Sequence, residues 1–266
     1  MKSFAGFALV AAVGLAIVSG CNNDSAKGSQ KSYVLVHGAW MGAWCWSDVA
    51  DGLRAKGATV TTVDLPAHGS DQTPVAQVTL QRYIETISAA VDAASLPVVL
   101  VGHSMGGMVI TGVAEARAAK LATIVYLGAY LPKDGQSLND IAMTDLDSHL
   151  GPALMIDPVA GLAKLPMDKL ADIFIADGTA DQIAKVTSNY RDEPLAPFLA
   201  PIHTTAAGWG SVPKGYIFTK DDHALSFSLQ QTMTAGVVMT ATTTLETSHA
   251  PFLSKPAQVV SVLESM

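Results

Sequence analysis

The segment PVVLVGHSMGG, residues 97–107, places a serine between two glycines directly after an apolar run. Such a run predicts a buried strand over 98–104, and residues 108–119 predict a helix. Between a strand and a helix, Gly-x-Ser-x-Gly becomes a specific pattern, because the sharp turn presents the serine hydroxyl. Larger neighbours would clash around the strained serine. Ser104 is therefore predicted to be a nucleophile, and an inert turn serine is the alternative.

A serine nucleophile needs a base within hydrogen-bond reach and an acid that orients the base. In this architecture the chain order is serine, acid, histidine. YIFTKDDHAL, residues 216–225, places Asp221 and Asp222 directly after a predicted strand. His249 follows the last predicted strand. Because the carboxyl ends of parallel strands meet at one sheet edge, these groups are expected near Ser104. The residues alone leave both aspartates open as the acid.

An acyl-transfer site also needs N–H donors aimed at the developing oxyanion. The backbone N–H of Met105, directly after Ser104, is the first candidate. The second is expected in the loop HGAW, residues 37–40, after the first strand, where the N–H of Ala39 is the natural donor. Gly38 allows the backbone to approach the site closely.

The predicted strands are continuous apolar runs rather than alternating ones, which indicates burial on both faces. They alternate with helices, so the sequence predicts an α/β fold with right-handed crossovers. We expect a mostly parallel sheet of about six strands flanked by helices. The expected strands are 33–39, 59–65, 98–104, 121–130, 215–220 and 242–248, and the expected helices include 44–56, 79–95 and 108–119.

The strand–helix alternation stops between residues 132 and 210, which indicates an inserted helical cap over the sheet edge. Helices are expected there at 167–176 and 179–189. RDEPLAPFLAPIH, residues 191–203, is too rich in proline for a helix or a central strand. The expected division is a signal peptide at 1–20, a tether at 21–31, a core at 32–132 and 208–266, and a cap at 133–207.

Composition narrows the function classes. Hydrophobic residues make up 49% of the 266 residues and charged residues 15%, against a usual charged share of about 25%, so a large buried core is expected. The net charge is −7 without a Lys/Arg cluster, which argues against nucleic-acid binding. No predicted helix carries a histidine pair at ligand spacing, and GHSMGG lacks the lysine of a phosphate-binding loop. We expect neither a metal nor a cofactor.

The first residues have a different character. After Lys2, residues 4–18 carry no charge, a length that fits a secretory signal and falls short of the roughly 20 residues of a membrane span. VSGC, residues 18–21, resembles a bacterial lipobox and predicts lipidation of Cys21. We therefore expect an exported lipoprotein of the cell envelope, on the periplasmic or outer-membrane side, held to the membrane only by this anchor. An ordinary signal peptide is the alternative.

If Cys21 carries lipid, Cys45 has no cysteine partner, and its apolar neighbours favour a small core residue. Trp40, Trp44 and Trp46 fit an acyl pocket and packing of the first helix equally well.

The other histidines are not expected to transfer protons. His37 and His103 border the predicted site and are expected to shape loops, and His68 is interpreted as a loop residue. Those expected to face solvent are His149, His203 and His223.

The segments YVLVHGAWMGAWCW, VDLPAHG, VVLVGHSMGG, GYIFTKDDHALSFSLQ and SHAPFLSKP occur in this order and cover nearly all of the chain beyond the tether. They resemble the α/β-hydrolases, specifically the plant methylesterases, hydroxynitrile lyases and small bacterial carboxylesterases. The resemblance implies a serine carboxylesterase for small, fairly apolar esters. It implies Asp222 as the acid, His249 as the base, and Ala39 and Met105 as oxyanion donors. Whether the protein forms a homodimer is left open.

Two other functions are compatible with the resemblance. The lyases of the group carry a threonine after the loop histidine and a lysine soon after the catalytic histidine, where this chain has Gly38 and Ala250-Pro251. A lyase would need a cation to hold cyanide, so a hydrolase is favoured. Hormone receptors of this fold keep intact triads, so a small-molecule sensor is the other alternative.

Overall fold

A computed structural model describes residues 1–3, 6 and 31–266. Cys21 and nearly all of the predicted signal peptide and tether lie outside the described residues. Among the residues that are described, none of the helices has the length and apolar character to cross a membrane.

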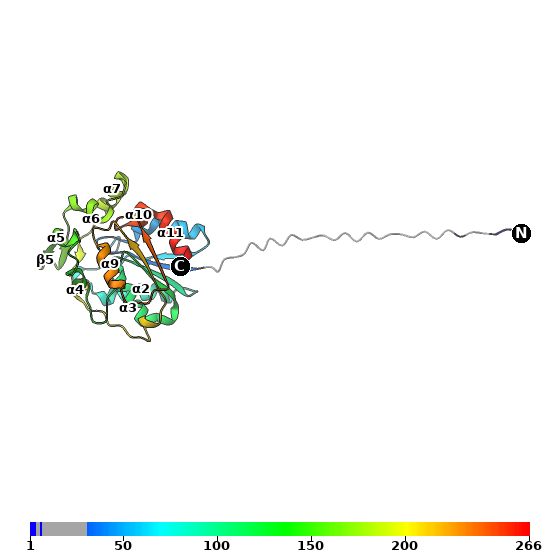
Figure 1. The fold of residues 1–266 in the computed structure, drawn as a ribbon, viewed down its shortest axis with the longest axis horizontal. Coiled ribbons are helices and arrows are strands. Elements are labelled where there is room, and N and C mark those ends of the chain that lie inside the picture. The colour runs from blue at the N-terminus through cyan, green and yellow to red at the C-terminus, as the bar shows by residue number, and fades with distance from the viewer. Residues whose placement is uncertain (4–5, 7–30) are drawn as a thin grey trace.

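The centre of the fold is a six-stranded sheet in the order β2-β1-β3-β4-β8-β9, with every neighbouring pair parallel. In Figure 1 the strands run through the middle of the folded part, with helices around them. This confirms the predicted α/β architecture. Parallel neighbours need crossover helices, so the four central strands are covered on both faces and are buried almost throughout. The edge strands β2 and β9 differ from the prediction of continuous buried runs, because exposed or half-buried residues alternate along them. The strands are β1 (Ser32–Val36), β2 (Thr59–Thr62), β3 (Val98–His103), β4 (Leu121–Leu127), β8 (Lys214–Thr219) and β9 (Ala241–Leu245).

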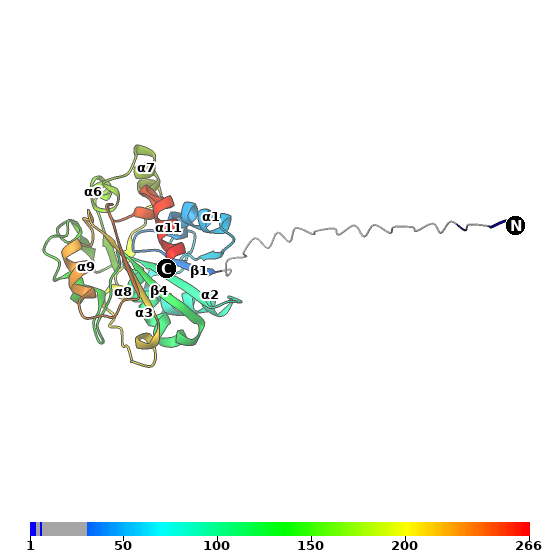
Figure 2. The ribbon, with the colours of Figure 1, turned by 45° about the vertical axis from the view of Figure 1, so that its right-hand side comes forward.

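Helices cover the two faces of the sheet (Figure 2). α1 (Ser47–Ala55) packs against α11 (Pro256–Ser265), and α2 (Leu80–Asp92) packs against α3 (Gly106–Arg117). The remaining helices of the core are α9 (Phe227–Thr234), α10 (Pro251–Ser254) and the short 3₁₀ turns η1 (Ala43–Trp46), η2 (Val75–Gln77), η3 (Ala118–Lys120) and η5 (Trp209–Ser211).

Two element boundaries have clear local causes. The side chain of Thr79 accepts a hydrogen bond from Arg82 N at the start of α2, one residue before the helix begins. The chain leaves α1 through Gly57, whose φ of +91° is a left-handed conformation that glycine adopts without strain. The strands end earlier than predicted: β1 stops at Val36, because the following residues form the loop at the carboxyl end of the sheet.

The chain between β4 and β8 contains the helices predicted at 167–176 and 179–189, but it also contains a small sheet that the sequence did not predict. β5, β6 and β7 form a three-stranded antiparallel sheet there. The strands have three residues or fewer, too short for a periodicity signal. The elements are α4 (Leu138–Ala142), α5 (Leu150–Ala153), β5 (Met155–Asp157), β6 (Leu162–Lys164), η4 (Met167–Lys169), α6 (Leu170–Ile175), α7 (Ala180–Asn189), β7 (Glu193–Pro194) and α8 (Ala196–Leu199).

The proline-rich stretch 191–203 differs from its prediction in containing the short helix α8, whereas its strand β7 is an edge strand, which the prediction allows. Pro194 belongs to β7, an edge strand of the small sheet, where a missing N–H is tolerated. Pro197 occupies the first turn of α8, where the N–H has no helical partner in any case.

Candidate active site

Ser104 stands in the turn between β3 and α3 with a φ of +54°, a left-handed conformation that is strained for serine. The flanking glycines are sterically required. A Cβ on Gly102 would lie 2.6 Å from the backbone oxygen of Gly106, and a Cβ on Gly106 would lie 2.9 Å from the oxygen of His37. The structure thus gives the physical reason for the Gly-x-Ser-x-Gly pattern.

The loop after β1 lies directly against this turn. A Cβ on Gly38 would be 2.8 Å from Cβ of Ser104. Ala39 and Met105 are both buried, and within the part of the chain that the structure describes neither backbone N–H donates a hydrogen bond. Two uncommitted donors therefore flank the serine, as an oxyanion site requires.

Asp222 and His249 are joined by a buried hydrogen bond. His249 Nδ1 is 2.7 Å from Asp222 Oδ2, and both side chains are at most 1% exposed. Backbone N–H groups of Ala224 and Leu225 donate to Asp222 Oδ1 over 2.9 and 2.8 Å. These two hydrogen bonds fix the orientation of the carboxylate. The carboxylate then holds the proton of the imidazole on Nδ1, which leaves the lone pair on Nε2.

His103, the residue directly before Ser104, contacts His249. The His103 Nε2–H donates to the backbone oxygen of His249 over 2.9 Å, and the two rings are 4.4 Å apart. Neither Ser104 Oγ nor the buried Nε2 of His249 makes a hydrogen bond to any described residue. Such contacts commonly tighten only when substrate binds.

Asp221 differs from Asp222, because it is exposed and its side chain makes no hydrogen bond to a described residue.

Two further hydrogen-bond donors to Asp222 were not predicted from the sequence. Thr219 Oγ1 lies 2.6 Å and Gln230 Nε2 3.3 Å from Asp222 Oδ2. The position of Thr219 at the end of β8 was a possible signal, whereas Gln230 sits in α9 with no pattern to mark it.

Aromatic side chains surround the site. The ring of Phe174, in α6, lies 5.9 Å from that of His249 and 5.8 Å from that of Trp40. The ring of Phe198 lies 5.7 Å from that of Trp40. Trp46, by contrast, is fully buried against Phe252 and belongs to the core.

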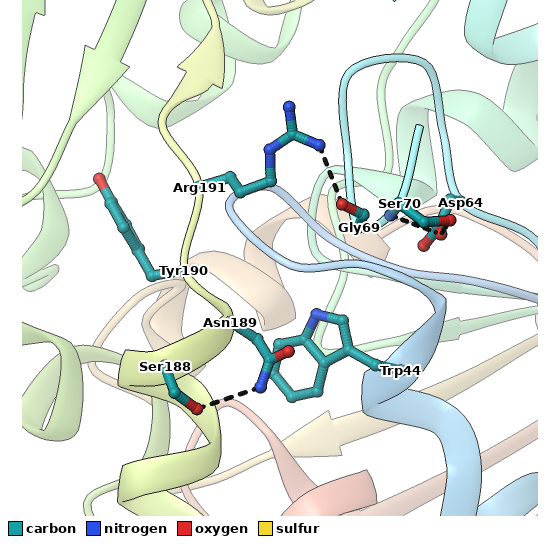
Figure 3. Close-up of a pocket in the computed structure, with 8 residues that line it drawn as sticks. All are labelled: Trp44, Asp64, Gly69, Ser70, Ser188, Asn189, Tyr190 and Arg191. Atoms are coloured by element: carbon teal, nitrogen blue, oxygen red, sulfur yellow. Dashed lines mark hydrogen bonds between the residues drawn. The ribbon is translucent and has the colours of Figure 1, made fainter. Parts of the chain in front are cut away.

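Trp44 takes a third position, in a pocket of about 460 Å³ between the loops of the core and residues 188–191 (Figure 3). Asp64 and Arg191 face this pocket, but both are already bonded. Asp64 accepts from Ala43 N and Ser70 N, and Arg191 donates to the oxygens of Gly69 and Asp71. Neither Ser104 nor His249 lines it.

A buried glutamate from β7 holds the loop that follows Ala39. Glu193 Oε2 accepts from Trp40 N over 2.9 Å and lies 2.6 Å from His68 Nε2, and Tyr83 OH donates to Oε1 over 3.3 Å. Trp40 has a φ of +60°, so this contact fixes a strained residue beside a candidate oxyanion donor. His68 lies in the loop after β2, as predicted, and is held there by Glu193.

The pKa shifts of the histidines differ with their surroundings. Burial, and then the neighbouring His68, lowers the pKa of His37 to about 3. Burial and then His249 hold the pKa of His103 well below its usual range. Burial also lowers the pKa of His68, but the charge and hydrogen bond of Glu193 outweigh it and raise the pKa overall. His37 and His103 thus stay neutral, which fits their expected role as shapers of loops.

Cys45 is fully buried and unpaired among the described residues. Burial raises the pKa of its thiol well above the usual range. A protonated, inaccessible thiol is unreactive, in agreement with the interpretation as a core residue.

The chain is similar in sequence to a known family and to several of its members. The model of the "Alpha/beta hydrolase family" matches residues 33–262. A "Carbendazim hydrolyzing esterase" of Nocardioides sp. (strain SG-4G) is 35% identical over 72% of this chain and 80% of its own. "Esterase PIR7B" of Oryza sativa subsp. japonica is 28% identical over 90% of this chain and 97% of its own. "Putative methylesterase 11, chloroplastic" of Arabidopsis thaliana is 28% identical over 87% of this chain, and the match spans 62% of the length of that relative.

Solved structures show the same fold. Polyneuridine aldehyde esterase superposes with a TM-score of 0.77 at 24% identity, over 89% of this chain and 99% of the other. A pyrethroid hydrolase from Sphingobium faniae JZ-2 gives a TM-score of 0.80 at 22% identity, over 89% and 97%. With the family model spanning most of its length and esterases among its relatives, this chain belongs to the alpha/beta hydrolase family and groups there with the carboxylic ester hydrolases.

Proposed function

We propose that the protein is a serine carboxylesterase that hydrolyses small, fairly apolar esters through an acyl-enzyme on Ser104. The buried hydrogen bond between His249 Nδ1 and Asp222 Oδ2 carries the proposal, because it leaves Nε2 of the histidine available as a base for Ser104. The uncommitted N–H groups of Ala39 and Met105 support it.

In the proposed reaction His249 Nε2 takes the proton of Ser104 as Oγ attacks the ester carbonyl carbon. The N–H groups of Ala39 and Met105 donate to the oxyanion. Collapse of the tetrahedral intermediate breaks the ester C–O bond, and the imidazolium gives its proton to the leaving alcohol. Water then repeats the cycle on the acyl-enzyme, and Asp222 stabilises the imidazolium in both halves.

The preference for apolar esters rests on the aromatic side chains near the base. Trp40, Phe174 and Phe198 form one contiguous group, and Phe174 reaches the ring of His249. These three side chains are at most 6% exposed, so the surroundings of the base are apolar and favour an apolar ester over a charged one. Rates on p-nitrophenyl esters of increasing acyl length test this preference. Carbendazim, named for one relative, is a further substrate to test.

The decisive test is Ser104→Ala with p-nitrophenyl acetate. Removing a triad nucleophile lowers kcat by roughly 10⁶-fold, so activity should fall to the detection limit while the circular dichroism spectrum stays unchanged. The alternatives have their own readouts: release of cyanide from mandelonitrile would indicate a lyase, and a single slow covalent turnover would indicate a sensor. Wild-type turnover retained by Ser104→Ala would refute the proposal.

We also propose that the mature protein begins at a lipidated Cys21, as the lipobox pattern predicts. A membrane tether of this kind leaves the folded domain outside the bilayer. Mass spectrometry of the N-terminal peptide tests it, and an unmodified peptide that starts before Cys21 would exclude it.

A further inference from the structure

Three side chains from separate parts of the chain converge next to the turn that carries Asp222. His149 immediately precedes α5, Asp172 lies in α6, and His223 follows Asp222 directly. One ligand-type atom from each lies within 4.8 Å of the other two. No helix spacing links the two histidines, so the sequence pattern that argued against a metal site could not reveal this cluster.

Both imidazoles direct Nδ1 at the same carboxylate. His149 Nδ1 is 2.9 Å from Asp172 Oδ2, and His223 Nδ1 is 2.9 Å from Asp172 Oδ1. The two rings are 4.2 Å apart with 35° between their planes. At bond lengths of 2.0–2.1 Å, tetrahedral ligands are roughly 3.4 Å from one another. The nitrogen–oxygen distances of 2.9 Å are shorter than this value, and the three ligand atoms lie within 4.8 Å of one another. Small side-chain rotations would therefore bring the three atoms to the spacing of a tetrahedral site.

The backbone holds this arrangement before any ion arrives. His149 N donates to the oxygen of His223 over 2.8 Å, and Ser148 Oγ donates to the oxygen of Ala224 over 2.8 Å. Asp145 accepts a further hydrogen bond from Ser226 N over 2.9 Å. These hydrogen bonds join residues 145–149 to residues 223–226. Little conformational entropy would remain to be lost on metal binding.

The cluster is open to solvent as well as ordered. The side chains of His149, Asp172 and His223 are 50%, 48% and 35% exposed. An ion can therefore enter directly, and water can fill a remaining coordination position. Two imidazole nitrogens and one carboxylate oxygen are the ligand set that suits zinc and its neighbours, whereas Mg²⁺ and Ca²⁺ prefer oxygen alone.

We propose that His149, Asp172 and His223 bind a divalent transition-metal ion of the zinc class. On binding, each neutral imidazole moves its proton from Nδ1 to Nε2 and offers the Nδ1 lone pair to the metal. The ion would clamp the segment between β4 and β8 to the turn of Asp222. This site does not depend on the esterase assignment, because its readout is metal binding.

The test is calorimetric titration of the chelator-treated full-length protein with ZnCl₂. We expect one ion per chain, and a rise in Tm of several degrees at saturating zinc, because the ion binds the folded state. His149→Ala and His223→Ala should each weaken binding at least about tenfold, and MgCl₂ should give neither signal. His203→Ala is the matched control: His203 Nδ1 is 3.3 Å from Asp134 Oδ1 in an exposed pair with no second histidine in the cluster.

Titration with Co²⁺ identifies the ligands spectroscopically in the wild-type protein. Nitrogen and oxygen ligands give visible d–d bands without a thiolate-to-cobalt charge-transfer band, and those d–d bands should disappear in Asp172→Asn with the circular dichroism unchanged. Absence of binding, binding that survives both histidine substitutions, or a thiolate band would each overturn the proposal.

Discussion

Glu193 Oε2 lies 2.6 Å from His68 Nε2, and neither side chain is exposed to solvent. Glu193 comes from β7, in the segment between β4 and β8, whereas His68 belongs to the loop after β2. A carboxylate removed from water is tolerated only when its oxygens are hydrogen-bonded. Here the partners are His68, Trp40 N and Tyr83 OH. This pair therefore joins the inserted segment to the loop beside the candidate oxyanion donor.

Glu193→Ala should lower the free energy of unfolding by about 3–5 kcal/mol, because it leaves the partners of the glutamate buried and unpaired. Denaturant unfolding followed by fluorescence measures the loss. Glu246→Ala is the matched control, because Glu246 forms a 2.8 Å pair with Lys220 in which the side chains are 68% and 49% exposed. That loss should stay below about 1 kcal/mol. Equal losses in the two variants would contradict the argument.

Stability should fall as the pH drops below about 6.5, the ordinary pKa of histidine. The pKa of His37 is lowered to about 3, and that of His103 lies well below its usual range. Both groups stay neutral in the folded chain and take up protons when it unfolds. Each histidine therefore lowers the free energy of unfolding by up to about 1.4 kcal/mol for every pH unit below pH 6.5. The effect of His37 continues down to about pH 3.

The raised pKa of His68 acts in the opposite sense. Its contribution is fully present below about pH 6.5 and is lost as the pH rises through the folded pKa. Unfolding free energies at pH 7.5 and 5.0 test the net effect. His103→Gln keeps a donor for the His249 oxygen but removes one titrating group, so the fall between these pH values should be smaller. An equal fall in unfolding free energy in the variant and the wild type would show that His103 does not contribute to the pH dependence.

The sheet and the order of the site residues could be predicted from sequence because both depend on local patterns. Continuous apolar runs identify strands buried on both faces, and parallel strands place their carboxyl ends at one edge. Ser104, Asp222 and His249 each follow a strand of this parallel sheet, so their placement at one edge follows from the topology. The choice between Asp221 and Asp222 came only from the family resemblance.

The remaining features depend on contacts without a local signal. Glu193 and His68 are 125 residues apart, and no spacing marks them as partners. The strands of the small sheet are too short to show a period of two. The cluster of His149, Asp172 and His223 likewise forms only through tertiary packing. A single sequence does not reveal which polar side chains, far apart along the chain, form pairs in the fold.

Gly107→Ala should destabilise the protein by at least about 3 kcal/mol. An added Cβ would lie 2.0 Å from the backbone oxygen of Tyr130, and backbone cannot rotate away as a side chain can. Gly151→Ala provides the comparison, since nothing lies within 4 Å of its Cβ position. It should be neutral or stabilise by up to about 1 kcal/mol. Thermal unfolding of both variants measures the two effects. A Gly107→Ala variant as stable as the wild type would show that the turn at Ser104 can shift.

Asp222→Asn should lower kcat on p-nitrophenyl acetate by about 10³- to 10⁴-fold, whereas Asp221→Asn should change it little. An amide at 222 can donate to Nδ1 of His249 and so favours the tautomer with its proton on Nε2, where it cannot accept the proton of Ser104. The exposed Asp221 makes no side-chain hydrogen bond among the described residues, so its charge is screened by solvent. Steady-state kinetics on the two variants, with circular dichroism as the check on folding, separates the roles. A larger fall for Asp221→Asn would require the 2.7 Å contact between Asp222 and His249 to be structural rather than catalytic.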